Sequence, residues 1–96
     1  MIRTGESISY YQNLLAQGHN PYIDVTKCDK VLLHLVEEIG ELVQANNKRS
    51  VTIPKEAGDV LILLMFYCIS KDINLEDVFV DKINENIMEG KFIPKE

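Results

Sequence analysis

The sequence predicts an all-α fold, a bundle-like domain of four helices with no convincing strand. Apolar residues recur at helical spacing over four segments of the chain. A residue suited to cap or start a helix precedes each segment, and turn-forming residues separate the segments. Ninety-six residues suffice for one small domain with a single core, so residues 1–96 are expected to form one domain.

The first two helices are predicted from their ends. Ser7 is the expected N-cap of a helix that stops before Gly18. Thr26 and Asp29 resemble a capping box with Asp in place of Glu. This box should open a second helix that ends near Asn46.

The last two helices carry equally local signals. Pro54 suits the first turn of a third helix, because the N–H that proline lacks would be unpaired there anyway. That helix should reach Ser70. Asn74 should cap a fourth helix, with acidic residues in its first turn and Gly90 after its last.

The apolar pattern predicts both a buried stripe and a partner. On the second helix Glu38 falls at the edge of the expected stripe, which consists of Leu32, Leu35, Ile39 and Leu42. The third helix should carry more apolar surface than three short neighbours can cover, formed by Leu63, Leu64, Phe66 and Tyr67. We therefore expect a homodimer or a homotetramer.

Charge and hydropathy exclude some classes of partner. A formal charge of −5 argues against a broad nucleic-acid surface, which is usually basic. The apolar run at residues 60–69 is shorter than the ~20 residues that span a bilayer. Cys28 and Cys68 form no CxxC pair and are expected to be reduced thiols, and the N-terminus lacks the apolar stretch of a signal peptide. A cytoplasmic location without membrane contact is expected.

Two acidic clusters interrupt the second and third helices: Glu37, Glu38 and Glu41, then Glu56 and Asp59. If these consecutive helices pack together, the five carboxylates can converge across the helix pair. Like charges one helical turn apart destabilise a helix by ~0.2–0.5 kcal/mol per pair, and a divalent cation would relieve that repulsion. Mg²⁺ prefers oxygen ligands and commonly shares them with substrate phosphates. The pattern therefore favours triphosphate hydrolysis, in which a spare carboxylate positions or deprotonates water.

The order EExxE and then ExxD resembles the MazG-like nucleoside triphosphate pyrophosphohydrolases of the all-α NTP pyrophosphatase superfamily. The resemblance covers roughly residues 30–86, through HLVEEIGELVQANNKRS, KEAGDVLILLMFYC and NLEDVFVDKINEN. It implies the MazG fold, dependence on Mg²⁺ with Mn²⁺ as a possible substitute, and cleavage between the α and β phosphates. The implied biological sense is removal of unwanted nucleoside triphosphates.

The resemblance also implies roles for individual residues. The implied metal ligands are Glu38, Glu41, Glu56 and Asp59. Glu37 and Glu38 are the implied catalytic carboxylates, with Glu37 positioning water in the outer shell. Lys82 and Asn86 match a Lys and an Asn that approach the substrate phosphates. A basic residue often follows a turn later, but Glu89 stands there and Lys91 comes two positions on.

Several alternatives stay open at this level. A phosphoribosyl-ATP pyrophosphatase has a similar carboxylate pattern, and a non-catalytic helical module could use the carboxylates for a structural cation. Independently of this choice, Lys82 and Asn86 could be ordinary exposed polar residues. The aromatic candidates for contact with a nucleobase are Tyr10, Tyr11, Tyr22 and Phe92, of which Tyr22 in its loop is the freest.

Overall fold

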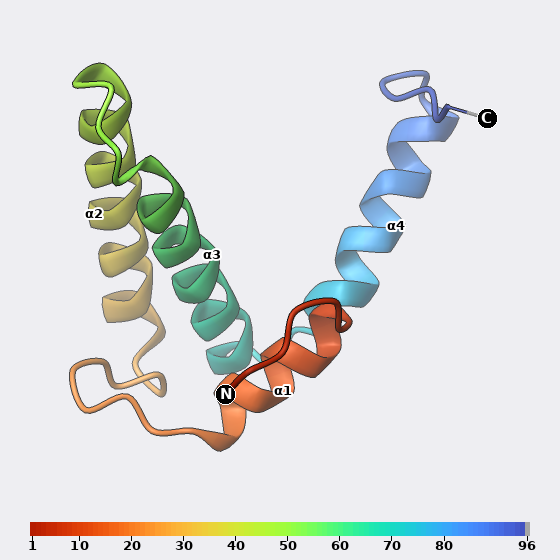
Figure 1. The fold of residues 1–96 in the computed structure, drawn as a ribbon. Coiled ribbons are helices and arrows are strands. Elements are labelled where there is room, and N and C mark those ends of the chain that lie inside the picture. Colours follow the sequence, from red (N-terminus) through yellow and green to blue (C-terminus); the bar gives the residue numbers. More distant parts are fainter. Residues whose placement is uncertain (96) are drawn as a thin grey trace.

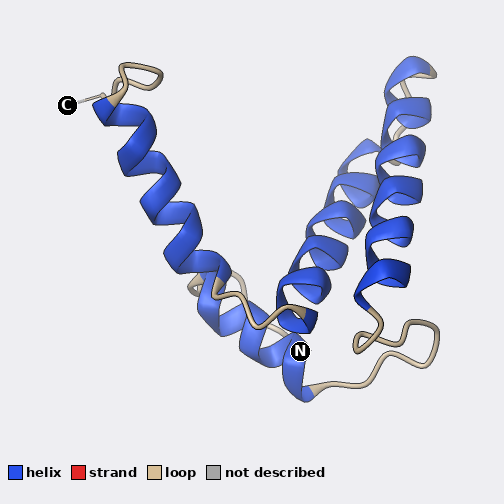
Figure 2. Ribbon diagram, turned by 180° about the vertical axis from the view of Figure 1, so that it is seen from behind, coloured by secondary structure: helices blue, strands red, loops and turns tan. Residues whose placement is uncertain are grey.

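The computed structural model describes residues 1–95, which form four α-helices and no strand (Figures 1 and 2). The helices are α1 (Ile8–Gln17), α2 (Cys28–Asn47), α3 (Ile53–Ser70) and α4 (Leu75–Met88). The all-α prediction is confirmed. α2 and α3 pack together as a hairpin, while α1 packs against α3 and α4. α4 extends away from the hairpin, so the chain is V-shaped, with extents of 43 × 35 × 30 Å.

Local side-chain caps start α1 and α4 as predicted. The Ser7 hydroxyl accepts a hydrogen bond from the Tyr10 N–H at 3.0 Å. The Asn74 carbonyl oxygen likewise accepts one from the Asp77 N–H at 3.2 Å. Each bond satisfies an N–H group that has no partner within its helix. Pro54 lies in the first turn of α3, also as predicted.

The predicted capping box of Thr26 and Asp29 is wrong. α2 begins at Cys28, and its N-cap residue is Lys27, whose side chain makes no capping bond within the described chain. The Thr26 hydroxyl instead donates to Asp24 Oδ1 at 2.6 Å, and the Thr26 N–H donates to the same oxygen at 3.0 Å. Thr26 therefore forms a local turn with Asp24, and its hydroxyl does not cap α2.

α2 and α3 meet along a seam with a repeat of seven residues. The buried and half-buried residues of α2 on this seam are Val31, Leu35, Glu38, Leu42 and Ala45. The matching residues of α3 are Ile53, Glu56, Val60, Leu63 and Tyr67. This spacing keeps one row of side chains facing the partner helix. The predicted stripe is therefore partly wrong, because Leu32 and Ile39 are 42% and 45% exposed.

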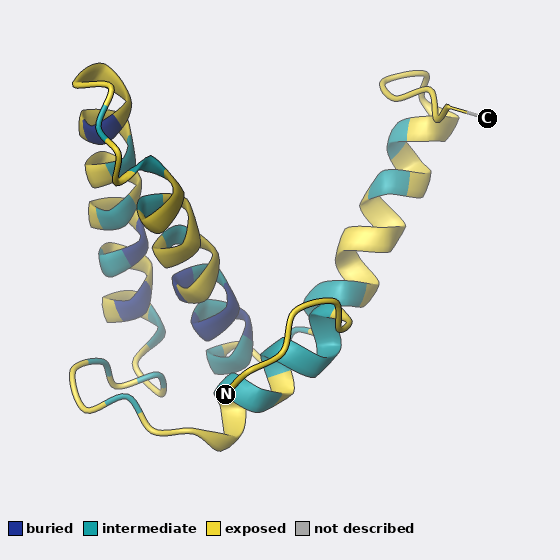
Figure 3. Cartoon of the chain, viewed as in Figure 1, coloured by how far each residue is buried: buried dark blue, intermediate teal, exposed yellow. Residues whose placement is uncertain are grey.

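The location of the exposed apolar surface also differs from the prediction. Leu63 and Phe66 are only 6% exposed, and Leu64 and Tyr67 pack against the core. Exposed apolar side chains lie instead on one side of α2, which we call the outer apolar face: Leu32, Val36, Ile39 and Val43. Figure 3 shows that the buried residues lie on α2 and α3, whereas α4 is largely exposed.

The cysteines and the apolar helices can be described for residues 1–95. Cys28 and Cys68 are both free thiols there, and burial raises the pKa of the Cys68 thiol. None of the helices described combines the length and the apolar character that crossing a membrane requires.

Candidate metal centre

Helix packing brings the two acidic clusters together. Glu38 stands in the row of α2 that also contains the buried residues Val31 and Ala45, one repeat before and after it. Glu56 stands on the facing row of α3, and Asp59 follows one turn later. Two carboxylates thus occupy seam positions that an ordinary helical hairpin fills with apolar side chains.

The three carboxylates converge closely enough to share one ion. One oxygen from each of Glu38, Glu56 and Asp59 lies within 4.8 Å of the other two. Glu38 and Glu56 are half-buried and Asp59 is exposed. Mg²⁺ binds oxygen at ~2.0–2.1 Å, so ligands on opposite sides of the ion are about 4 Å apart. Small rotations of these three side chains would bring their oxygens to distances suitable for binding one Mg²⁺ ion.

Two oxygens of this cluster lack a partner. Oε2 of Glu38 and Oε2 of Glu56 are buried, and neither accepts a hydrogen bond from the residues that the structure describes. Leaving a buried charged oxygen unpaired is costly, because it has lost its water without replacement. A divalent cation supplies the missing partner, so the donor set fits one.

The electrostatics indicate the same need. Burial raises the pKa of Glu38 above its ordinary value, and the charge of Glu41, a hydrogen bond to it and the charges of Asp59 and Glu56 raise this pKa further. Burial also raises the pKa of Glu56, with Glu41 and Asp59 adding to the effect. The metal-free cluster therefore holds negative charge that its own surroundings disfavour.

The other two predicted carboxylates lie beside this cluster. Glu41 is exposed and is not one of the three converging residues, although it interacts with both Glu38 and Glu56. Glu37 is also exposed, and its Oε2 lies 3.5 Å from Nδ1 of His34. Counted at ~100° per residue, Glu37 and Glu41 fall on the same flank of the seam as Asp59. Water can reach this flank.

The chain does not bring its predicted phosphate-binding residues to the carboxylates. Lys82 and Asn86 lie on α4, which extends away from the hairpin (Figures 1 and 2). Lys82 Nζ pairs with Glu85 Oε1 at 3.1 Å. Lys91 pairs with Glu89 at 2.8 Å, just beyond the end of the helix.

The acidic clusters contain two helix-interior glycines, Gly40 and Gly58. A Cβ atom at either would meet no other part of the described chain within 4 Å. A close approach by this chain's own backbone therefore does not account for them.

Glu38 was predicted at the edge of the apolar stripe of α2, but in the structure it lies in the middle of the seam. The signal was present in the spacing of Val31, Glu38 and Ala45, which are seven residues apart. The stripe through Leu32 and Ile39 has equally good helical spacing, so periodicity alone favoured neither row.

Comparison with known families agrees with this site. The model of the MazG nucleotide pyrophosphohydrolase domain matches residues 27–87, more than half of the chain. The matched stretch contains both acidic clusters, Lys82 and Asn86. No match was found among curated proteins or among solved structures.

Proposed function

Because the chain belongs to the MazG nucleotide pyrophosphohydrolase domain family, we propose that it hydrolyses nucleoside triphosphates with the help of Mg²⁺. Its substrates would be ribo- or deoxyribonucleoside triphosphates, cleaved between the α and β phosphates to a monophosphate and pyrophosphate. The observation that carries this proposal is the convergence of Glu38, Glu56 and Asp59, two of which have buried, unpartnered oxygens.

The carboxylates divide into two roles. Glu38, Glu56 and Asp59 hold the cation, and Glu41, which interacts with Glu38 and Glu56, is the proposed fourth ligand. When bound, the cation neutralises phosphate oxygens and orients the phosphate chain for attack. Mn²⁺ offers similar chemistry and is the expected substitute.

Glu37 is the proposed base. Its carboxylate is exposed on the flank of the seam that carries Asp59, so it can accept a hydrogen bond from a water molecule beside the phosphates. As that water attacks phosphorus, its proton passes to Glu37, the anhydride bond breaks and pyrophosphate leaves. His34, at 3.5 Å, helps to orient the Glu37 carboxylate.

Lys82 and Asn86 are proposed to contact the phosphates from a second copy of the chain. They lie one turn apart and share a face of α4. Since α4 extends away from its own hairpin, the α4 of another copy is the one that can approach the carboxylates. A homodimer, or a homotetramer built from dimers, would provide this arrangement. The proposed setting is the cytoplasm, where the enzyme would remove unwanted nucleotides.

Product analysis tests the proposal. The protein is incubated with each ribo- and deoxyribonucleoside triphosphate and with phosphoribosyl-ATP, in Mg²⁺, in Mn²⁺ or in EDTA, and the products are identified by ³¹P NMR. Monophosphate and pyrophosphate are expected in the metal-containing reactions alone. Turnover restricted to phosphoribosyl-ATP would instead assign a phosphoribosyl-ATP pyrophosphatase, and a folded protein without any turnover would be a helical module with a structural cation.

A further inference from the structure

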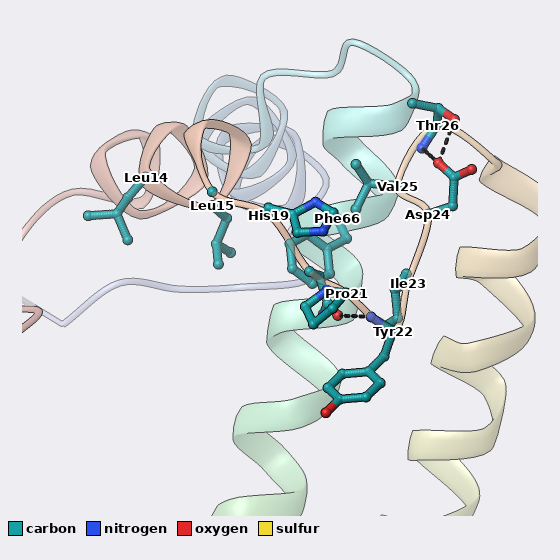
Figure 4. Close-up of a pocket in the computed structure, with 12 residues that line it drawn as sticks. Leu14, Leu15, His19, Pro21, Tyr22, Ile23, Asp24, Val25, Thr26 and Phe66 are labelled. Atoms are coloured by element: carbon teal, nitrogen blue, oxygen red, sulfur yellow. Dashed lines mark hydrogen bonds between the residues drawn. The ribbon is translucent and has the colours of Figure 1, made fainter.

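A hollow of about 950 Å³ lies apart from the carboxylates, between the end of α1, the loop of residues 18–26 and α3 (Figure 4). Its lining is mostly apolar, with Leu14 and Leu15 from α1 and Phe66 from α3. Its size is at the upper end of the ~300–1,000 Å³ typical of sites for small organic ligands. It is therefore large enough for a small organic group.

The hollow lies on the side of the hairpin that carries the exposed carboxylate of the metal centre. Asp59 and Phe66 are seven residues apart in α3. Seven residues make almost two full helical turns, so their side chains leave the same face of the helix about 10 Å apart along its axis. Glu41 and Glu37 of α2 fall on this same flank. A ligand bound at Asp59 can thus extend along α3 to Phe66.

Tyr22 belongs to the lining of the hollow. Its side chain is 90% exposed, and in Figure 4 the ring extends from the loop beside α3. Asp59 belongs to the N-terminal half of the same helix. The loop around it is held by the bonds from Thr26 to Asp24 and by a bond of 2.8 Å from the Tyr22 N–H to Asn20 Oδ1. An aromatic face is therefore presented at the edge of the hollow.

We propose that this hollow receives the nucleobase of the substrate, with the base stacked on Tyr22 and its far edge against Phe66. The inference rests on the proposed function, because it places the phosphates at the carboxylates. The separation of Asp59 and Phe66 is comparable with the reach of a nucleotide from its outer phosphates to its base. Aromatic stacking accepts any base, because every base has a π face.

The first test is kinetic. Tyr22→Ala should raise KM for nucleoside triphosphates by roughly five- to a hundredfold, the range expected from losing one base–aromatic stack. Tyr22→Phe keeps the ring and should stay near the wild-type KM. The matched control is Val51→Ala, which removes a 94% exposed apolar side chain from the turn between α2 and α3. Mg²⁺ affinity, measured by calorimetry without nucleotide, should be unchanged in all three variants.

The second test needs neither metal nor turnover. Nucleoside monophosphates are added to ¹⁵N-labelled wild-type protein in EDTA, and the amide resonances of residues 18–20, of residues 22–26 and of Phe66 should shift. Shifts there support the base site even if the wild type hydrolyses no triphosphate, an outcome that counts against the proposed function alone. An unchanged KM in Tyr22→Ala, or shifts confined to other parts of the chain, would overturn the inference and leave the proposed function intact.

Discussion

Glu38 occupies a position at which an apolar residue would pack better. Its neighbours in the same row of α2, Val31 and Ala45, are 0% and 6% exposed. Its Oε2 atom is buried without a partner, and the charge of Glu41 adds to the burial that raises its pKa. A carboxylate at such a position destabilises the metal-free hairpin, in keeping with the proposed role of Glu38 as a cation ligand.

Glu38→Gln should abolish most activity without unfolding the protein, because it removes a ligand charge and keeps the size of the side chain. Loss of a direct ligand should cost at least the roughly 10- to 100-fold that loss of an outer-shell partner costs. Turnover and Mg²⁺ titration measure this effect, and thermal unfolding in EDTA should show equal or higher stability. The control is Asp29→Asn, an exposed carboxylate at the start of α2. Near-normal turnover at saturating Mg²⁺ would remove Glu38 from the metal site.

The raised pKa values of Glu38 and Glu56 predict how stability depends on pH. In the folded chain the pKa of both carboxyls lies above its ordinary value of 4.5. At a pH above 4.5 the native state therefore holds more protons than the unfolded state. Stability of the metal-free protein should therefore fall as the pH rises from 4.5 through the raised pKa values. Thermal unfolding in EDTA across this range measures the slope.

Two comparisons make the pH prediction specific to these carboxyls. Saturating Mg²⁺ should diminish the slope, because the cation binds the deprotonated carboxylates. Glu38→Gln should also make the EDTA curve flatter, since it removes one of the two groups responsible. A slope of equal size in that variant would assign the effect to other groups.

Among the helices, α4 has apolar residues but no buried residue in the described chain. Val78, Phe79 and Val80 are 48%, 48% and 47% exposed, and as consecutive residues they point to different sides of the helix. A helix with apolar residues on several sides is typical of a buried element. Val78 and Phe79 precede Lys82 by four and three residues, so they share a face of α4 with Lys82 and Asn86.

Lys82→Ala should lower kcat/KM by roughly ten- to a hundredfold, because it removes a charge-assisted contact worth ~1.5–3 kcal/mol with the phosphates. Stability should change little, since the exposed pair with Glu85 is worth ~0–1 kcal/mol. Mg²⁺ affinity of the protein without nucleotide should also stay unchanged. Lys82→Arg, which keeps the charge, is the matched variant. An unchanged kcat/KM would leave Lys82 as a surface residue, and lost Mg²⁺ affinity would mean that α4 supports the metal site.

For the whole molecule, the V shape leaves apolar surface on both arms. The outer apolar face of α2 is defined by side chains that are 42–61% exposed, and α4 adds Val78 and Phe79. Contiguous patches of this kind mark interfaces in soluble proteins. A second copy of the chain is expected to cover this surface.

Sedimentation or light scattering should therefore give at least a dimer at micromolar concentration. Val36→Arg places a charge on the outer apolar face and should shift the protein toward monomer, because burying that charge is costly. Val51→Arg, in the exposed turn after α2, is the control and should leave the assembly intact. If the partner's α4 supplies phosphate contacts, the Val36→Arg variant should also lose kcat/KM. A wild-type protein that remains monomeric at these concentrations would contradict the assembly.

The extent of prediction from the sequence differed between local and non-local features. Ser7 and Asn74 were predicted as caps and confirmed, because a cap depends on atoms within three residues of the side chain. Thr26 was predicted as a cap and is not one, since its hydroxyl and its N–H both donate to Asp24. The convergence of Glu38 with α3 was predicted from the spacing of the clusters, whereas its depth in the seam was not.

The amino-acid sequence by itself determined the all-helical class, the ends of the helices to within two residues and the family signature, since all three depend on short-range pattern. Only the tertiary structure decided which row of α2 faces α3, which carboxylate oxygens are buried and where α4 points. The physical reason is that a helix can turn about its own axis at little local cost. Its orientation is therefore set by the summed packing of side chains from both helices, which no single segment contains.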